Sequence, residues 1–246
     1  MASEACCKPA PAAEHFDEGT TIKFGGLDAY VNPGLATAIR TSAVILISDV
    51  FGYDKPLIRE LADKTAARGF FVVVPDLFHG DPFVPTDPQN PAGSISAWMP
   101  KHDATDLIGL KAVIKQLREQ GVKKIGVAGF CWGAKPAMGL AVEDEPLIDS
   151  AVFCHPSLLT DDEVRSIKVP AQFLLSEIDR QVPPERAAAF KEILASKPEV
   201  ESFLKIFPGM EHGWAVRYDV NVPEQVKAAH EAHDDMLGWY KKHLTV

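Results

Sequence analysis

"GVAGFCWGAKPA", residues 126–137, contains the pattern Gly-x-Cys-x-Gly around Cys131. The run that leads into it, "KKIGVAGF" (123–130), is short and apolar like a buried strand, and "AKPAMGLAVE" (134–143) after it has a helical pattern. A side chain between a strand and a helix, with a glycine two residues away on each side, can stand exposed on a sharp, strained turn. The stretch therefore predicts a nucleophilic thiol at Cys131, and the alternative is a structural cysteine buried in a tight turn.

Similar strand-like runs alternate with helical patterns through the rest of the chain. Strands are expected over residues 42–48, 70–76, 123–129, 150–155, 171–176 and 201–207, with a hairpin over 21–31 that turns at Gly25-Gly26. Helices are expected over residues 56–69, 103–121, 133–143, 183–196 and 223–244. Nearly all-apolar strands that alternate with helices predict an α/β fold with a mostly parallel central sheet and helices on both faces. Such a sheet places its ligand site beyond the carboxyl ends of the strands.

Length and composition limit the class of protein. The chain has 246 residues, 46% of them hydrophobic, and a net charge of −9. We expect one α/β domain over residues 20–246, preceded by a flexible tail over 1–19. The negative charge argues against nucleic-acid or anionic-membrane partners. We expect a monomer or weak homodimer that acts on a small molecule.

Cysteine usage and hydropathy bear on location. The cysteines are Cys6, Cys7, Cys131 and Cys154, and two of them are adjacent, so they do not form a disulfide framework. This usage favours a reducing compartment, and there is no apolar run of signal-peptide or membrane-span length. The sequence therefore predicts a cytoplasmic protein.

One segment, residues 79–102, differs from the rest because it is rich in proline, glycine and polar residues. Loops of this length are usually functional or disordered. Since it leaves the carboxyl end of a strand, we expect it to form a wall or lid of the pocket.

An acid and a base for the predicted nucleophile follow in the order that this architecture requires: nucleophile, carboxylate, histidine. Asp179 and His212 each lie in a loop just after a strand-like run. His212 would hold Cys131 as an ion pair and later protonate the leaving group. Asp179 would orient the imidazole. Glu177 is the competing acid, and Asp179 is preferred because it lies farther into its loop.

Acyl transfer also needs donors for the oxyanion. The backbone N–H of Trp132, directly after the nucleophile, is one candidate. The other is the N–H of Val50 in "DVFGY" (49–53), the loop after the strand expected at 42–48.

These residues resemble the dienelactone hydrolase (carboxymethylenebutenolidase-like) family, whose members have the α/β-hydrolase fold. The resemblance rests on "DVFG" (49–52), "VVPDLF" (73–78), "GFCWGA" (129–134), "SEIDRQVP" (176–183) and "EHGWAVR" (211–217). It implies a Cys131–Asp179–His212 triad that hydrolyses lactones or small esters through a thioester acyl-enzyme, with no metal or organic cofactor.

The resemblance also suggests residues around the triad. The family places an acidic residue before the oxyanion-hole residue, where it helps gate thiolate formation, and here that position is Asp49. Bacterial members bind a substrate carboxylate with arginines. Arg217 stands close to one of those positions, and His79 is the nearest substitute for the other.

Three aromatic residues, Phe51, Trp98 and Trp214, are expected as apolar walls of the pocket, and a core position is an equal alternative. His155, at the end of a strand, either lines the pocket or only caps the strand. His230 and His233, three residues apart on the last helix, are interpreted as a solvated face rather than a metal site.

Three other functions are open alternatives. Some family members carry β-glucanase names, and a glycosidase would need two carboxylates that straddle one bond. The second alternative is a non-catalytic ligand receptor on the same scaffold. The third is a redox-sensing protein in which Cys154 would be the partner of the Cys131 thiol, although a core position is the preferred interpretation of Cys154.

Overall fold

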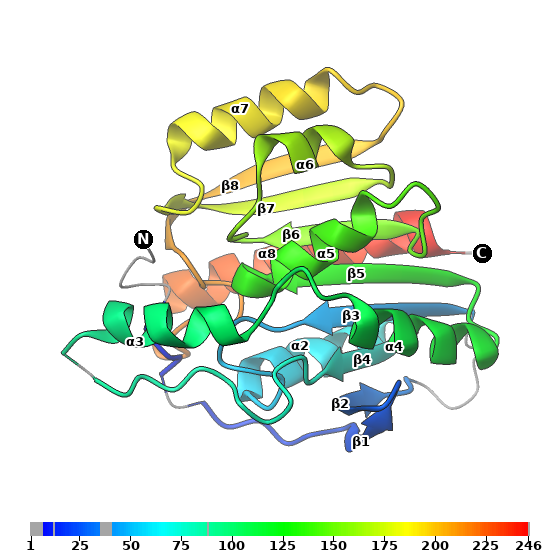
Figure 1. Cartoon of the computed structure of the whole chain (residues 1–246), viewed down its shortest axis with the longest axis horizontal. Helices are drawn as coiled ribbons and strands as arrows, with labels where there is room; N and C mark the ends of the chain where they lie inside the picture. Colours follow the sequence, from blue (N-terminus) through cyan, green and yellow to red (C-terminus); the bar gives the residue numbers. More distant parts are fainter. Residues whose placement is uncertain (1–6, 12, 35–40, 88, 246) are drawn as a thin grey trace.

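The computed structural model describes residues 7–11, 13–34, 41–87 and 89–245, and its centre is one eight-stranded sheet (Figure 1). The strands are β1 (Thr20–Phe24), β2 (Leu27–Asn32), β3 (Ser42–Ile47), β4 (Phe71–Pro75), β5 (Lys124–Phe130), β6 (Ser150–Cys154), β7 (Ala171–Ile178) and β8 (Ser202–Glu211). Their order is β1-β2-β4-β3-β5-β6-β7-β8. All neighbouring pairs from β4 to β8 are parallel, and only the β1–β2 hairpin and the β2–β4 pair are antiparallel. The expected mostly parallel sheet is confirmed.

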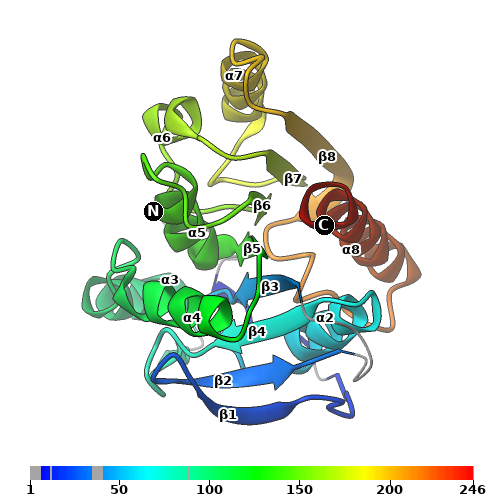
Figure 2. The same ribbon diagram turned by 90° about the vertical axis from the view of Figure 1, so that its right-hand side faces the viewer.

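Helices cover both faces of this sheet (Figure 2). They are α2 (Pro56–Ala67), α3 (Pro91–Trp98), α4 (Ile108–Glu119), α5 (Ala134–Ala141), α6 (Asp161–Ser166), α7 (Pro184–Ala195) and α8 (Pro223–Leu244), with short 3-10 turns η1 (Met99–Lys101) and η2 (Cys131–Gly133). Helices α2 and α8 lie on one face, and the others lie on the opposite face. Along β3 the side chains alternate between the two cores: Ala43, Ile45 and Ile47 face one, and Val44 and Leu46 face the other.

Some elements differ from the sequence expectation. The segment 79–102 carries α3, whose first turn has Pro91 and is capped by the side chain of Asn90, which accepts from the Gly93 N–H. Helix α6 begins at a capping box formed by Thr160 and Glu163. Helix α4 begins at Ile108 rather than 103, because aspartate side chains in residues 103–107 bind nearby backbone N–H groups instead.

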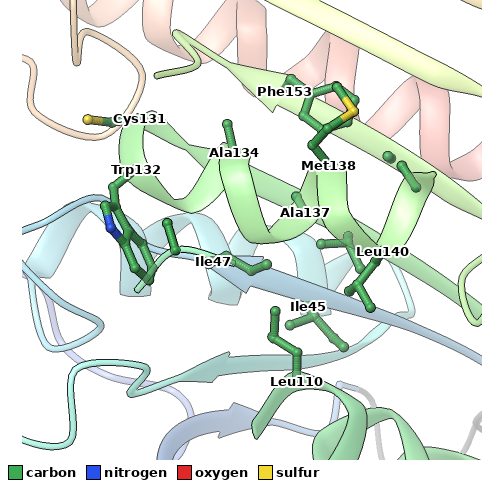
Figure 3. Packing of buried hydrophobic residues seen from close by; sticks show 14 of the residues in the cluster. Ile45, Ile47, Leu110, Cys131, Trp132, Ala134, Ala137, Met138, Leu140 and Phe153 are labelled. Carbon is green, nitrogen blue, oxygen red and sulfur yellow. The ribbon is translucent and has the colours of Figure 1, made fainter. Parts of the chain in front are cut away.

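The face of the sheet below α5 is closely packed (Figure 3). Alanines 134 and 137 let the helix approach the strands, and Met138 fills the space toward Phe153 on β6. These side chains are fully buried, as is Ile47 at the end of β3. The turn between β5 and α5 therefore rests on a rigid base.

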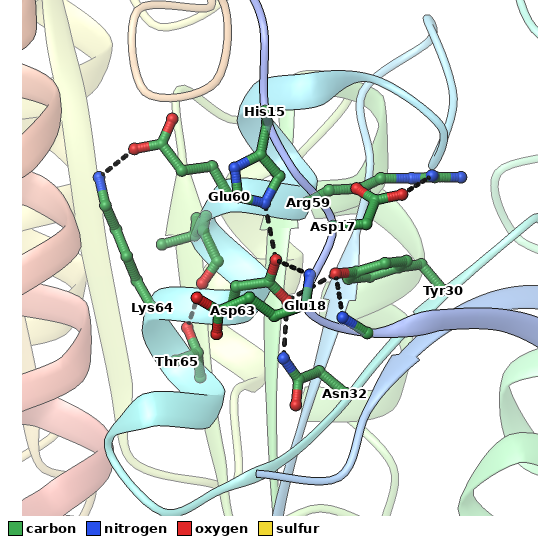
Figure 4. A network of polar contacts seen from close by, with 12 residues as sticks. His15, Asp17, Glu18, Tyr30, Asn32, Arg59, Glu60, Asp63, Lys64 and Thr65 are labelled. Atoms are coloured by element: carbon green, nitrogen blue, oxygen red, sulfur yellow. Dashed lines mark hydrogen bonds and ion pairs between the residues drawn. The ribbon is translucent and has the colours of Figure 1, made fainter.

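A buried polar network holds the segment that precedes β1 (Figure 4). Asp63 of α2 accepts hydrogen bonds from the Tyr30 hydroxyl at 2.6 Å and the Asn32 amide at 2.7 Å. Its other oxygen lies 2.6 Å from His15 Nε2 and accepts from the Glu18 N–H at 3.1 Å. The network joins residues 15–18 to β2 and α2.

Within the described ranges, no helix combines the length and the apolar character that crossing a bilayer would need.

Candidate active site

Cys131 follows β5 directly and has a backbone φ of +52°, a conformation that is rare for residues other than glycine. A Cβ atom on Gly129 would lie 2.3 Å from the Gly133 carbonyl oxygen. A Cβ atom on Gly133 would lie 2.3 Å from the Ile47 carbonyl oxygen. The two glycines are therefore required because the backbone of the turn touches itself and the end of β3. Figure 3 shows the thiol at the start of the helical segment, pointing away from the core below α5.

The structure brings Asp179 and His212 together in the way that the chain order predicts. Asp179 follows the last residue of β7, and His212 follows the last residue of β8. His212 Nδ1 lies 2.7 Å from Asp179 Oδ2, and both side chains are buried. Asp179 also accepts from the Ser176 hydroxyl at 2.9 Å and from the Gln181 N–H at 2.8 Å. These contacts fix the carboxylate, and the carboxylate fixes the orientation of the imidazole.

The electrostatics of the site favour a charged imidazole. Burial alone would lower the pKa of His212, but the negative charge of Cys131 and hydrogen bonds to Asp179 and Cys131 raise it to about 9. Burial would also raise the pKa of Asp179, but hydrogen bonds and the charge of His212 lower it below its ordinary value. A Cys131 thiolate, a His212 imidazolium and an Asp179 carboxylate are mutually stabilising here.

Ser157 is a site residue that sequence reasoning missed. Its hydroxyl oxygen lies 3.5 Å from Cys131 Sγ and 3.4 Å from His212 Nε2, and its N–H donates to the Cys131 carbonyl at 3.0 Å. The available signal was its position, because it lies three residues after the end of β6, at the edge of the sheet where parallel strands place functional groups.

A cavity of about 350 Å³ opens at Cys131. The residues that border it come from the β3–α2 loop, from α3 and η1, from the β5–α5 turn and from the loops after β6 and β7: Val50, Ile95, Ser96, Met99, Pro100, Cys131, Trp132, Ser157, Leu158 and Gln181. Val50 and Trp132, the expected oxyanion-hole residues, are among them. The segment 79–102 supplies four of these residues and is therefore a wall of the cavity, through α3 and η1.

The expected residues Asp49, Phe51, His79, Trp98, Trp214 and Arg217 are not among those that border this cavity. Asp49 and Arg217 form a buried ion pair, with Oδ2 and Nη1 3.3 Å apart. The Arg217 guanidinium also lies over the Phe51 ring, 5.1 Å from its centre. Burial raises the pKa of Asp49 although Arg217 and the Phe51 N–H act to lower it.

Trp98, the last residue of α3, has its ring centre 5.0 Å from that of Phe78, and its Nε1 donates to the Asp81 carbonyl. Trp214 packs against Phe207 at 4.3 Å. His79 is exposed to solvent.

His155 is fully buried and packs edge-on against His212, with the two ring centres 5.2 Å apart. Burial, together with the nearby charges of His212 and Arg217, lowers the pKa of His155 well below its ordinary value. It therefore packs as a neutral ring against the imidazole of His212.

The remaining candidates have structural partners. The Glu177 carboxylate is exposed and accepts from the Gly209 N–H at 2.7 Å. Asp179, rather than Glu177, is the carboxylate that contacts His212. His233 is buried with its Nε2 2.8 Å from the Ala215 carbonyl, whereas His230 lies 3.1 Å from Lys64 on the surface. In the ranges described, the side chains of His, Cys, Asp and Glu form no group of three or more suited to a metal ion.

Comparison with known proteins identifies a family. The sequence model of the Dienelactone hydrolase family matches residues 27–244. Hydrolase pyvD of Aspergillus violaceofuscus is 32% identical over 97% of this chain and 96% of its own length. The carboxymethylenebutenolidase homolog of Xenopus tropicalis is 30% identical over 99% of this chain and 100% of its own. An endo-1,3;1,4-beta-D-glucanase of Zea mays is 38% identical over 72% of this chain and 54% of its own.

Among solved structures, a dienelactone hydrolase from Anabaena variabilis superposes with a TM-score of 0.63 at 13% identity, covering 94% of this chain and 99% of that one. At that identity the likeness bears on the fold alone.

Proposed function

The chain belongs to the dienelactone hydrolase family and is an ester or lactone hydrolase, and we propose that it works through a Cys131–His212–Asp179 triad and a thioester intermediate. The observation that carries this proposal is the buried chain of contacts from Asp179 through His212 to Cys131, in which a negative Cys131 contributes to the raised pKa of His212. A thiolate stabilised in this way needs no proton removal when it attacks.

In the first half-reaction, Cys131 Sγ attacks the carbonyl carbon of the lactone or ester. The negative charge that develops on the carbonyl oxygen is held by the N–H groups of Val50 and Trp132, both of which border the cavity. When the tetrahedral intermediate collapses, His212 gives its proton to the leaving oxygen, and the acyl group stays on sulfur as a thioester.

In the second half-reaction, neutral His212 takes a proton from water, and the resulting hydroxide attacks the thioester. Cys131 leaves as the thiolate and the acid is released, which restores the ion pair. The Ser157 hydroxyl, within about hydrogen-bonding reach of both Cys131 and His212, donates to the thiolate in this resting state.

The test compares the purified wild type with Cys131→Ala and Cys154→Ala on an aliphatic lactone, an aryl acetate and a mixed-linkage β-glucan. Cys154 is a matched control because it is buried at the end of β6 and its pKa is raised by burial. We expect kcat for the lactone and the ester to fall at least about 1,000-fold in Cys131→Ala. Cys154→Ala should keep most of the wild-type kcat.

Each protein is mixed with a slowly hydrolysed ester, quenched during turnover and analysed by intact-protein mass spectrometry. The mass of the acyl group should be found on the wild type and on Cys154→Ala but not on Cys131→Ala. Wild-type rates of ester cleavage in Cys131→Ala would refute the triad. Glucan cleavage that survives the substitution would favour the glycosidase alternative.

A further inference from the structure

We propose that the substrates are uncharged, apolar lactones or esters, and that Arg217 is a positioning residue for the site rather than a binding group for a substrate carboxylate. This inference rests on the proposed function, because it takes the cavity at Cys131 as the place where the acyl group binds.

The first support is the lining of that cavity. Ile95, Met99, Pro100 and Leu158 give it apolar walls, and Val50 and Trp132 form the part next to the thiol. The polar residues on its border, Ser96, Ser157 and Gln181, carry no charge. Among the described residues that border the cavity, none is a lysine, an arginine or a histidine.

The second support is the position of Arg217. Its guanidinium is already engaged with the buried carboxylate of Asp49, with the face of Phe51 and with the carbonyl of His212, which accepts from Nη2 at 3.4 Å. An arginine that contacts three parts of the site holds the β3–α2 loop against the loop that carries His212. A second carboxylate would have to compete with Asp49 for the same cation.

The third support comes from described residues near the start of the chain, 7–11 and 13, several of which lie on the Arg217 side of the site. Pro9 and Pro11 border two cavities that Arg217 also borders, and neither cavity includes Cys131. Cys7 is fully buried, and its burial and the negative charge of Cys131 raise the pKa of its thiol although the charge of Arg217 acts to lower it. The open space beside the guanidinium therefore lies in cavities other than the one at Cys131, although His212 also borders one of them.

The energetic consequence is a penalty for acidic substrates. A carboxylate in the cavity loses water and gains no cation, whereas a methyl group of similar size gains from contact with Ile95, Met99 and Leu158. The protein discriminates against the charged compound because no cation offsets the cost of removing water from the carboxylate. This discrimination requires no specific contact with the neutral compound.

The experiment measures kcat/KM for two enol lactones that differ only in one substituent, methyl or carboxylate. Five full-length proteins are compared: wild type, Cys131→Ala, Ser96→Arg, Ser96→Gln and Arg217→Lys. Ser96 is exposed on α3 at the border of the cavity, so that arginine there adds a cation near the substrate, and glutamine controls for length.

We expect the wild type to prefer the methyl compound by at least about tenfold. Ser96→Arg should improve the relative kcat/KM for the carboxylate compound up to about fivefold over Ser96→Gln, as one partly exposed ion pair allows. Arg217→Lys should lower both rates by a similar factor, leaving their ratio within about twofold.

A wild-type preference below tenfold, or a loss in Arg217→Lys confined to the carboxylate compound, overturns the inference and leaves the triad intact. Failure of the proposed function gives a different pattern: either compound hydrolysed equally by Cys131→Ala and wild type, or neither hydrolysed by wild type. That pattern overturns both.

Discussion

Residues with strained backbone conformations are concentrated around Cys131, the proposed nucleophile. Among described residues, four that are not glycine have positive φ: His79, Cys131, His155 and Leu158. Three of them lie just after β5 and β6, at the edge of the sheet where the cavity opens. Such conformations cost free energy and persist only where the surroundings impose them. At Cys131 the surroundings are the contacts of the β5–α5 turn with the end of β3, and the strain holds the thiol in the cavity.

The raised pKa of His212 predicts how activity depends on pH. Its value of about 9 lies above the ordinary 6.5, so His212 remains an imidazolium at neutral pH and loses its proton as the pH rises through about 9. Because a neutral imidazole cannot protonate the leaving oxygen, kcat/KM for an aliphatic lactone should fall above about pH 9. The same shift stabilises the folded protein below about pH 6.5, and this contribution is lost as the pH passes through the folded-state pKa.

The measurement is a pH–rate profile from pH 6 to 10.5, corrected for the reaction in Cys131→Ala. Asp179→Asn should move the descending limb to lower pH, because Asp179 is one of the groups that raise the pKa of His212. A wild-type profile that stays level to pH 10.5 would contradict the assignment.

At the scale of elements, the contact between the β5–α5 turn and β3 sets the position of the thiol. In Gly133→Ala, a methyl group must be accommodated 2.3 Å from the Ile47 carbonyl and 2.5 Å from that of Ser48. Since neither backbone group can rotate away, we expect a loss of about 1–3 kcal/mol in the free energy of unfolding, together with a loss of activity.

Gly238→Ala in α8 is the matched control, because a Cβ there meets no atom within 4 Å. It should be neutral or stabilising by up to about 1 kcal/mol, with full activity. Urea unfolding of both variants measures the difference, and equal stabilities would show that the turn tolerates the extra methyl group.

Elements with a clear period were predictable from the sequence. The parallel strands are nearly all apolar and their helices are amphipathic, so the alternation of strands and helices along the chain could be predicted. That alternation also predicted the edge of the sheet where Cys131, Asp179 and His212 meet. Helix α3 was not predictable in this way, because proline and glycine dominate its surroundings and its start depends on the Asn90 cap. The Asp49–Arg217 pair and the contacts of Ser157 with Cys131 and His212 depend on loops from distant parts of the chain, and no local pattern encodes such contacts.

At the scale of the whole molecule, Asp63 connects three separate segments. In Asp63→Ala, the Tyr30 hydroxyl, the Asn32 amide and His15 lose their common partner in a buried place. We expect the free energy of unfolding to fall by about 3 kcal/mol, which urea denaturation measures.

Asp28→Ala is the control for this prediction, because Asp28 pairs with Lys23 at 3.0 Å on the surface and should cost less than about 1 kcal/mol. A similar small cost for Asp63→Ala would mean that the network contributes little to stability.

The two ends of the described chain lie at opposite ends of the parallel strands. Leu244, at the end of α8, accepts a hydrogen bond from Ser42, the first residue of β3. Cys7, in contrast, lies near enough to Cys131, at the carboxyl ends of the strands, for the charge of Cys131 to act on it. Attachment to a bead or an electrode through the C-terminal side would turn the cavity toward the bulk liquid. Attachment ahead of Cys7 would turn it toward the support, so that diffusion of lactone through the layer of immobilised protein would limit the rate.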